Sequence, residues 1–360
     1  MVLNEAVAAT RTQLKRGEFR GAAGEYFGIW IVNILLTIVT FGIYSAWAKV
    51  RRNRYFYGNT YLDGHAFDYH ARGKQIFIGR LIVFGVLIGI NIVSAFVPLV
   101  VILFPLVLFA GLPWLFMRGL RFSARVTSYR NVRFDFVGTL GGAYKAVLLG
   151  WIVSVVSLGL AVPVATRWYY KWVLDNLRYG DRAFVTQPRL KPIYMAWLVP
   201  LTLILVTIIG YGAMDIAILM ETQPGDLDQL ESSGWVVGAM AISHLLIVII
   251  YPLILLSLFF FHISVRNIVL SATTFDKRHQ LVSDIGRLRY LWIVASNFLV
   301  SIASLGLMRP WAAVREQRYK VSHTGILVEG EIGEVVAAIG NSGPAASEEF
   351  LEMEGFDFGF

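Results

Sequence analysis

The chain has 360 residues, of which 56% are hydrophobic and only 16% are charged, whereas an average soluble domain carries about 25% charged residues. Residues 81–117 contain no Asp, Glu, Lys or Arg, and only lipid readily solvates so long an apolar stretch. The composition therefore excludes an ordinary soluble domain and predicts a polytopic membrane protein. Because the chain has no cysteine, disulfides and cysteine-based metal or thiol chemistry are excluded as well.

The formal net charge of +8 is distributed unevenly. Residues 329–360 contain eight acidic and no basic residues, so residues 1–328 carry all 32 Lys and Arg against 16 of the 24 acids, a net charge of +16. The cations flank apolar segments, which favours positive-inside topology and anionic lipid headgroups over binding of nucleic acid. The first 20 residues are polar and basic and do not read as a signal peptide.

In chain order, six uncharged runs are the candidate membrane helices: 26–48, 81–117, 146–166, 192–214, 232–265 and 290–308. A helix that crosses the membrane needs about 20 apolar residues. The run 81–117 is therefore too long for one crossing, and we expect a break near Ser94–Pro98 that makes it a tight pair of spans. Spanning helical hairpins are predicted over residues 76–117 and 192–265.

Two segments far apart in the chain have the same pattern. Residues 41–55 read FGIYSAWAKVRRNRY and residues 305–319 read LGLMRPWAAVREQRY, with Gly, Trp, Val-Arg and Arg-Tyr at matching positions. A weaker copy contains Gly159 and has Lys171 in the place of Arg54. We infer three internal repeats, over residues 18–75, 133–190 and 274–335.

Each repeat is predicted to contain a membrane-dipping apolar helix, a Gly turn, a basic amphipathic helix and a small β element. In the first repeat, residues 59–73 are expected to form a β-hairpin that turns at Asp63-Gly64, and residues 179–181 occupy that place in the second. The predicted fold class is mainly α, with the β elements on the cytoplasmic face. Residues 1–337 are expected to form one membrane domain, followed by a linker and an acidic–aromatic tail over residues 338–360.

Charge placement favours re-entrant or interfacial repeat helices over fully spanning ones. If the first repeat helix crossed the membrane, the basic residues 49–80 would lie opposite the basic N-terminus. If each repeat helix instead dips in, turns at Gly42, Gly159 or Gly306 and returns, every basic segment and both termini are cytoplasmic. Glycine tolerates a positive φ because it has no Cβ, so these three residues are the predicted hinges.

Residues 24–73, GEYFGIWIVNILLTIVTFGIYSAWAKVRRNRYFYGNTYLDGHAFDYHARG, resemble the YjgN family of bacterial inner-membrane proteins, which is defined by a domain of unknown function. The ending EEFLEMEGFDFGF over residues 348–360 is similar to the acidic–aromatic tail of that family. The resemblance implies a location in the bacterial inner membrane. It implies no reaction and no catalytic residues.

Three residues form a candidate intramembrane polar site: Asn33, Asn297 and His244. The two asparagines occupy the same repeat position inside apolar helices, where an amide needs a hydrogen-bond partner. Either they bond between helices or they line a substrate path. His244 lies well inside a predicted full crossing, and ionisable residues at such depth are functional candidates.

Two arginine pairs form the candidate contacts to anionic lipid or to the tail. Arg51 with Arg54, and Arg315 with Arg318, are spaced i and i+3 and therefore share one helix face. One interpretation is that they snorkel and hold an amphipathic helix at the headgroups. The other is that their guanidinium groups clamp a phosphate or carboxylate.

Enzyme signatures are missing from the sequence. The six histidines make no H-E-x-x-H, residues 138–145 lack the spacing of a phosphate-binding loop, and no G-x-S-x-G occurs. We therefore expect a protein that is not an enzyme and that needs no metal or cofactor.

Two functions remain, and the first is favoured. The repeat-built membrane domain suggests transport or a channel-like role. The alternative is a membrane scaffold that recruits a protein partner through its cytoplasmic face and tail. In the tail, Phe356, Asp357, Phe358 and Phe360 are the predicted contact residues, because Phe356-Asp357-Phe358 resembles the strand-like piece at 134–136.

Overall fold

A closed β-barrel organises the protein. The computed structural model describes residues 12–97, 99–221 and 234–330, together with 333–334, 336–337 and 339. Within these residues ten antiparallel strands close in the order β1-β10-β9-β8-β7-β6-β5-β4-β3-β2. The strands are β1 (Thr12–Phe19), β2 (Thr60–Leu62), β3 (His65–Tyr69), β4 (Thr127–Tyr129), β5 (Val132–Phe136), β6 (Leu177–Tyr179), β7 (Arg182–Thr186), β8 (Thr273–Phe275), β9 (His279–Ser283) and β10 (Thr324–Glu329).

Helical hairpins are inserted between the strands. In the described chain, five pairs of helical arms alternate with the strands: the first pair follows β1, each of the other four follows a β-hairpin, and the last leads to β10. The arms are α1 (Ala23–Val39) and α2 (Ser45–Gly58); α3 (Gly73–Phe96) and α4 (Leu99–Arg125); α5 (Leu140–Ala143), η1 (Tyr144–Leu149) and α6 (Gly150–Val156) with α7 (Val162–Asp175); α8 (Leu190–Glu221) and α10 (Gly234–Ser271); α11 (Arg287–Ala303) and α12 (Arg309–Ser322).

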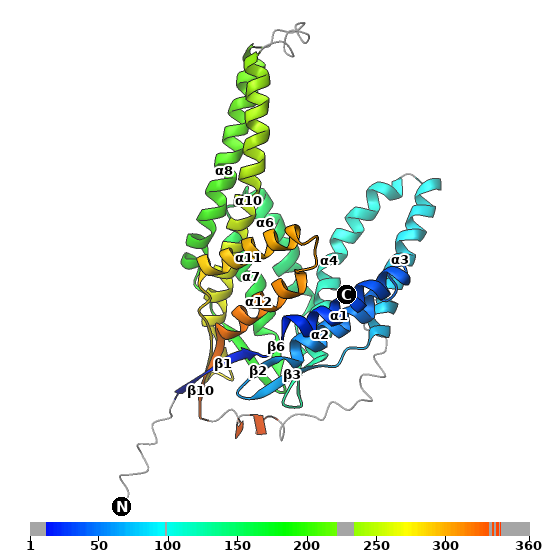
Figure 1. Cartoon of the computed structure of the whole chain (residues 1–360), viewed down its shortest axis with the longest axis vertical. Coiled ribbons are helices and arrows are strands. Elements are labelled where there is room, and N and C mark those ends of the chain that lie inside the picture. The colour runs from blue at the N-terminus through cyan, green and yellow to red at the C-terminus, as the bar shows by residue number, and fades with distance from the viewer. Residues whose placement is uncertain are drawn as a thin grey trace, which may run out of the picture.

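These helical hairpins form a ring on one end of the barrel. Neighbouring hairpins pack through α2 and α3, α4 and α5, α7 and α8, and α10 and α11, and the ring closes where α1 contacts α12. We call this arrangement the helix ring. All helical hairpins leave the barrel on the same side, and α8 with α10 extends furthest (Figure 1).

A repeated hydrogen bond ties each helical hairpin to the next. In the second arm of each hairpin, the residue six positions before the following strand donates from its side chain to a backbone carbonyl where the next hairpin begins. The five bonds are Arg54 to Ala71 (3.2 Å), Arg121 to Gly138 (3.4 Å), Lys171 to Thr186 (3.2 Å), Asn267 to Ile285 (2.8 Å) and Arg318 to Gly21 (2.9 Å). We call these residues the ring donors.

Turn chemistry explains the short β-hairpins. Between β2 and β3, Asp63 and Gly64 have φ of 49° and 78°, and between β4 and β5, Arg130 and Asn131 have φ of 48° and 65°. Two successive residues with positive φ give the turn whose twist matches that of paired strands. Gly180, with a φ of 58°, lies in the turn between β6 and β7.

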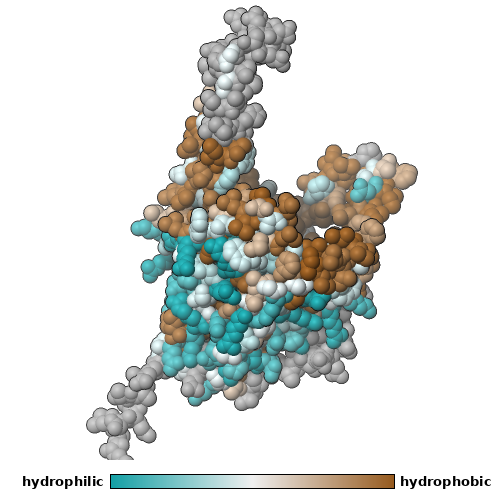
Figure 2. All heavy atoms as spheres, in the orientation of Figure 1, coloured by the Kyte–Doolittle hydropathy of each residue, from teal (hydrophilic) through white to brown (hydrophobic). Residues whose placement is uncertain are grey.

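Four described helices are long and apolar enough to cross a membrane: Gly73–Phe96, Leu99–Arg125, Leu190–Met214 and Val248–Ser271. The expected break near Ser94–Pro98 falls between α3, which ends at Phe96, and α4, which begins at Leu99. Hydrophobic surface covers the helices that project from the barrel, whereas the barrel end is mainly hydrophilic (Figure 2). The predicted mainly helical fold is confirmed, and the four long apolar helices are consistent with a polytopic membrane protein.

The barrel corrects the expectation of small, separate β elements. The β elements are strands of one closed sheet, not separate small pieces, because a three-residue strand left alone would keep unpaired edges that only closure removes. The two hairpins predicted outside the repeats, at 76–117 and 192–265, connect barrel strands in the same way as the others. The described chain therefore carries five helical hairpins on one barrel, at the places of the three predicted repeats and the two predicted spanning hairpins.

Candidate functional site

The interior of the barrel contains a cavity of about 390 Å³. Every one of the ten described strands contributes a residue to its wall. Side chains of one strand alternate between the two faces of a sheet, so in a closed barrel every second residue points inward. On β9, for example, His279 and Leu281 line this cavity. We call the cavity the lumen.

Aromatic rings form most of the wall on one side. Three cross-strand pairs lie directly opposite one another in the strand register, each with its ring centroids 4.9 Å apart: Phe67 with Tyr129, Phe134 with Tyr179, and Phe184 with Phe275. Such tilted pairs stabilise a sheet beyond their buried area, by about 0.5–1.5 kcal/mol each.

The tyrosine hydroxyls of this wall do not face the lumen as free donors. Tyr129 donates to the carbonyl of Leu62 at 2.7 Å, and Tyr179 donates to the carbonyl of Tyr129 at 2.8 Å. Burial raises the pKa of both phenols. The two tyrosines therefore present neutral rings, and the wall is apolar in character.

The end of the lumen away from the helix ring is covered by the chain after β10. Val336 and Ile339 are buried and pack with the barrel core. At Gly180, a Cβ atom would lie 2.3 Å from Ile339 Cγ2, so only glycine allows this approach. Val336 and Ile339 belong to the part of the chain that precedes the acidic–aromatic tail.

The other end of the lumen, next to the helix ring, is polar. Arg266 of α10, and Gln317 and Lys320 of α12, line it. Arg266 is half-buried and donates to Ser283 Oγ and Thr324 Oγ1, both at 2.7 Å. Among the described residues it forms no ion pair with a carboxylate. Lys320, in contrast, pairs with Glu316 at 2.5 Å.

A second cavity of about 470 Å³ adjoins this polar end. It lies between α2 and α12 and shares Thr60, Phe67, Gln317 and Lys320 with the lumen. Arg52 and Asn53 of α2 line its other side. We call it the vestibule. The shared residues place the vestibule directly beside the polar end of the lumen.

His279 contributes the one buried imidazole of the described lumen wall. It is 1% exposed, and its Nδ1 accepts from the backbone N–H of Glu329 at 3.2 Å. Its Nε2 is buried and has no hydrogen-bond partner among the residues that the structure describes. Burial and the neighbouring Arg278 lower the pKa of this imidazole below its usual value, so it is neutral at physiological pH.

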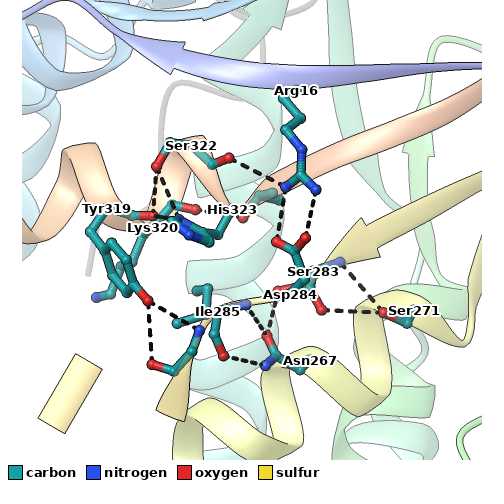
Figure 3. Close-up of polar contacts among 12 residues, drawn as sticks. Arg16, Asn267, Ser271, Ser283, Asp284, Ile285, Tyr319, Lys320, Ser322 and His323 are labelled. Carbon is teal, nitrogen blue, oxygen red and sulfur yellow. Dashed lines mark hydrogen bonds and ion pairs between the residues drawn. The ribbon is translucent and has the colours of Figure 1, made fainter. Parts of the chain in front are cut away.

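A polar network fixes the position of α10 and α12 at the mouth of the lumen (Figure 3). Arg16 of β1 binds both carboxylate oxygens of Asp284, at 2.9 and 2.5 Å, just after β9. Asn267 accepts from Ser283 Oγ at 2.7 Å and donates to the carbonyl of Ile285 at 2.8 Å. Tyr319 accepts at its hydroxyl from the backbone N–H of Gly286 at 3.1 Å. Charge-assisted and bidentate bonds of this kind impose a fixed geometry on the helices.

The sequence that folds into this barrel matches a known protein family. The sequence model of the family described as "Bacterial protein of unknown function (DUF898)" matches residues 15–353. The chain belongs to this family. The resemblance carried by residues 24–73 is thereby confirmed.

Curated members of the family are inner-membrane proteins. The chain is 27% identical over 343 residues to inner membrane protein YjgN of Salmonella typhimurium, covering 82% of this chain and 84% of that protein. It is 35% identical over 150 residues to inner membrane protein YjgN of Escherichia coli strain K12, covering 41% of this chain and 38% of that protein. No solved structure matches the chain.

Both candidate asparagines lie between the two helices of a hairpin. Asn33 donates from Nδ2 to the carbonyl of Ala48 at 3.5 Å, and Asn297 donates to that of Ala312 at 3.1 Å. Asn297 also accepts from Arg315 at 3.0 Å, whereas Asn33 Oδ1 is buried with no partner in the described part of the chain. Neither residue lines the lumen. His244 belongs to α10, but its side chain lies outside the described part of the structure.

The candidate arginines bind their own chain. Arg54 and Arg318 are ring donors. Arg51 donates to Tyr44 Oη at 3.3 Å, and Arg315 donates to Ser296 Oγ at 2.7 Å in addition to Asn297. Arg315 and Arg318 share a groove of about 710 Å³ with Arg289.

The three predicted hinges lie at helix-to-helix turns. Gly42, Gly159 and Gly306 have φ of 90°, 86° and 88°, a region that disfavours any residue with a Cβ atom. The predicted tail residues Phe356, Asp357, Phe358 and Phe360 lie outside the described residues.

Sequence reasoning missed the lumen. Its signal was an aromatic residue at the end of a short strand, followed by a turn and then a second aromatic residue, as at Tyr129 and Phe134 or at Tyr179 and Phe184. No sequence motif marked Arg266, whose side chain lines the lumen. Its role depends on which helix face meets the barrel mouth, and that face is set by packing.

Proposed function

We propose that this protein has a transport or channel-like role in the bacterial inner membrane, with the lumen as its solute chamber. The observation that carries the proposal is the position of the lumen: it is bounded by the barrel, adjoins the helix ring and shares lining residues with the polar vestibule. Ligand sites in proteins are concave, mostly apolar and equipped with a few polar groups, as this one is. The proposal assigns no catalytic step to any residue.

The proposed topology places the barrel and both termini in the cytoplasm. The hairpins α3–α4 and α8–α10 would cross the membrane, and the three shorter hairpins would enter it without crossing. Their turns support this arrangement because Phe41, Leu158 and Leu305 are 98%, 85% and 95% exposed, and exposed apolar residues at a turn are best solvated by lipid.

Anionic lipids are the proposed surroundings of the groove that contains Arg289, Arg315 and Arg318. Trp292 and Trp311 line the same groove, and tryptophan is enriched at membrane interfaces. None of the three arginines pairs with a carboxylate in the described part of the chain.

Accessibility of the lumen from the two sides of the membrane tests the transport proposal. Because the chain has no cysteine, a single Leu281→Cys substitution places one thiol in the lumen. A solute path predicts that a small impermeant thiol reagent reaches this thiol from the cytoplasmic side in inverted vesicles and, during turnover, from the periplasmic side in spheroplasts. Leu14→Cys, which is 42% exposed on β1, serves as the control and should react only from the cytoplasmic side. Absence of labelling at Leu281→Cys from the periplasm would argue against transport.

A scaffold function is the second candidate. The burial of Val336 and Ile339 at the barrel end supports it, because the chain is then anchored to the barrel shortly before the acidic–aromatic tail. Deletion of residues 346–360 should leave the melting temperature unchanged and remove co-purifying proteins if the tail recruits a partner. A lower melting temperature would indicate that the tail binds its own barrel. If neither changes, the tail has no such role.

A further inference from the structure

We infer that the lumen binds an anionic amphiphile, with a carboxylate or phosphate group beside Arg266 and an apolar body among the aromatic pairs. This inference rests on the proposed function, because it names the class of solute that the chamber holds. Three features of the described residues carry it: the charge of Arg266, the apolar wall, and the sign of the charges along the vestibule.

The first feature is a cation without a counter-charge. Arg266 is half-buried at the mouth of the lumen, and its two hydrogen bonds within the described chain go to the neutral hydroxyls of Ser283 and Thr324. A guanidinium group has five N–H donors, so most of its hydrogen-bonding capacity remains available. Removing a charge from water is costly unless an opposite charge compensates for it. A ligand oxyanion would supply this compensation through charge-assisted, bidentate hydrogen bonds.

The second feature is the wall beyond Arg266. The rings of Phe134, Phe184 and Phe275 carry no polar atom, and the hydroxyls of Tyr129 and Tyr179 are occupied by backbone carbonyls. A polar solute such as a sugar would therefore lose its hydrogen bonds to water and find few replacements, which is unfavourable. An alkyl or aromatic body gains from burial here, and the volume of about 390 Å³ falls within the usual range for ligand pockets.

The third feature is the charge around the route of access. Arg52 and Lys320 line the vestibule, and Glu316, the acid among its lining residues, is already paired with Lys320 and accepts from Tyr290. Aromatic rings on their own also attract cations. Here a cationic amphiphile would have to pass Arg52 and approach Arg266, neither of which pairs with a carboxylate among the described residues, so repulsion between like charges disfavours it.

Binding of matched ten-carbon probes tests the inference. The full chain, in nanodiscs of a zwitterionic lipid, is titrated by calorimetry with decanoate, decyl phosphate and decyltrimethylammonium. We expect saturable 1:1 binding of at least one of the two anions, and at least tenfold weaker binding of the cation. Decanoate and decyl phosphate distinguish a fatty-acid-like ligand from a phospholipid-like one. Equal binding of the cation and the anions would overturn the inference.

Variants locate the site. Arg266→Gln should weaken binding of the preferred anion at least tenfold, whereas Arg287→Gln, on α11 and outside the lumen lining, should leave binding unchanged. Arg266→Lys keeps the charge and should retain the preference for anions, which keeps the test valid if the Gln variant fails to fold. Acetate and inorganic phosphate should bind at least tenfold more weakly than the ten-carbon anions. If they bind as tightly, the site is an anion site without an apolar subsite and the inference is wrong.

The two proposals fail separately. The titration needs no gradient and no movement of solute. Saturable binding of decanoate together with a lumen thiol that reacts from the cytoplasmic side alone would leave the ligand class intact and refute transport. Labelling of the lumen thiol from both sides of the membrane, together with equal binding of the anionic and cationic probes, would leave transport intact and refute the ligand class.

Discussion

Arg318 Nη2 donates to the carbonyl oxygen of Gly21 at 2.9 Å, although the two residues are 297 positions apart in the chain. This bond joins the last helical hairpin to the first and completes the circle of ring donors. It lies beside the seam where β1 pairs with β10. Both ends of the described chain are therefore needed to close the barrel and the helix ring together.

Removal of a ring donor should loosen one junction of the helix ring. Arg318→Ala is expected to lower the free energy of unfolding by about 1–2 kcal/mol, because a hydrogen bond from a charged group is lost and Gly21 O is left without this donor. Asn267→Ala should cost more, about 2–3 kcal/mol, because Asn267 also accepts from Ser283 and from the backbone of Ile285.

Thermal melting in detergent measures these differences. Arg52→Ala is the matched control, since Arg52 lies on α2 near the ring donor Arg54. Its guanidinium group lies over the aromatic side chain of Phe56, 5.8 Å from the ring centroid. Equal melting temperatures for the Arg318, Asn267 and Arg52 variants would show that the ring donors do not stabilise the fold.

The left-handed backbone at the helix turns should make Gly42 intolerant of a side chain. A Cβ atom at Gly42 or at Gly24 would meet nothing within 4 Å, so crowding is absent at both positions. Gly42 has a φ of 90°, whereas Gly24 is helical within α1. Gly42→Ala is expected to destabilise the protein by about 1–3 kcal/mol. Gly24→Ala should instead stabilise it slightly, because alanine is the better helix former. If the two substitutions shift the melting temperature in the same direction, conformational strain at the hinge is not the cause.

Acidification should destabilise the barrel through His279. The unfolded chain binds a proton at this imidazole as pH falls below about 6.5, whereas burial holds the folded-state pKa lower, so the folded protein binds it only at more acidic pH. Between these two values the unfolded state is favoured by protonation, and stability falls as pH decreases. Arg278, Asp276 and Glu329 are the charged neighbours that act on this imidazole.

Melting temperatures between pH 7.5 and 5 check this expectation. A His279→Gln variant should lose less stability over that interval than the wild type does, whereas His65→Gln, which changes an exposed histidine, should keep the wild-type dependence. A pH dependence in His279→Gln identical to that of the wild type would place the titrating group elsewhere.

The proposed topology predicts opposite labelling of two introduced thiols. Cys in place of Phe96, which is 82% exposed at the end of α3, should react with an impermeant reagent added outside spheroplasts. Cys in place of His65, at the turn of a barrel hairpin, should react only after the membrane is permeabilised. External labelling of the His65→Cys variant would place the barrel in the periplasm and reverse the proposed orientation.

The sequence by itself determined the elements that depend on neighbouring residues. Uncharged runs located the four long helices, since a span of lipid needs a continuous apolar segment. Asp63-Gly64 located a β-turn, because few residues tolerate two successive positive φ angles. The matched glycines at 42 and 306 located equivalent helix turns for the same reason.

Only the tertiary structure decided the barrel, the lumen and the roles of the arginines. Most strands have three to five residues, too few for alternation to be recognised, and β3 must pair with β4 across an intervening helical hairpin. The arginines at 54 and 318 have side chains that suit lipid contact as well as internal hydrogen bonds. Which of the two they make depends on backbone carbonyls of the next unit, brought within reach only by barrel closure. A periodic sequence pattern reports local geometry, whereas the lumen exists because strands distant in the chain share one closed sheet.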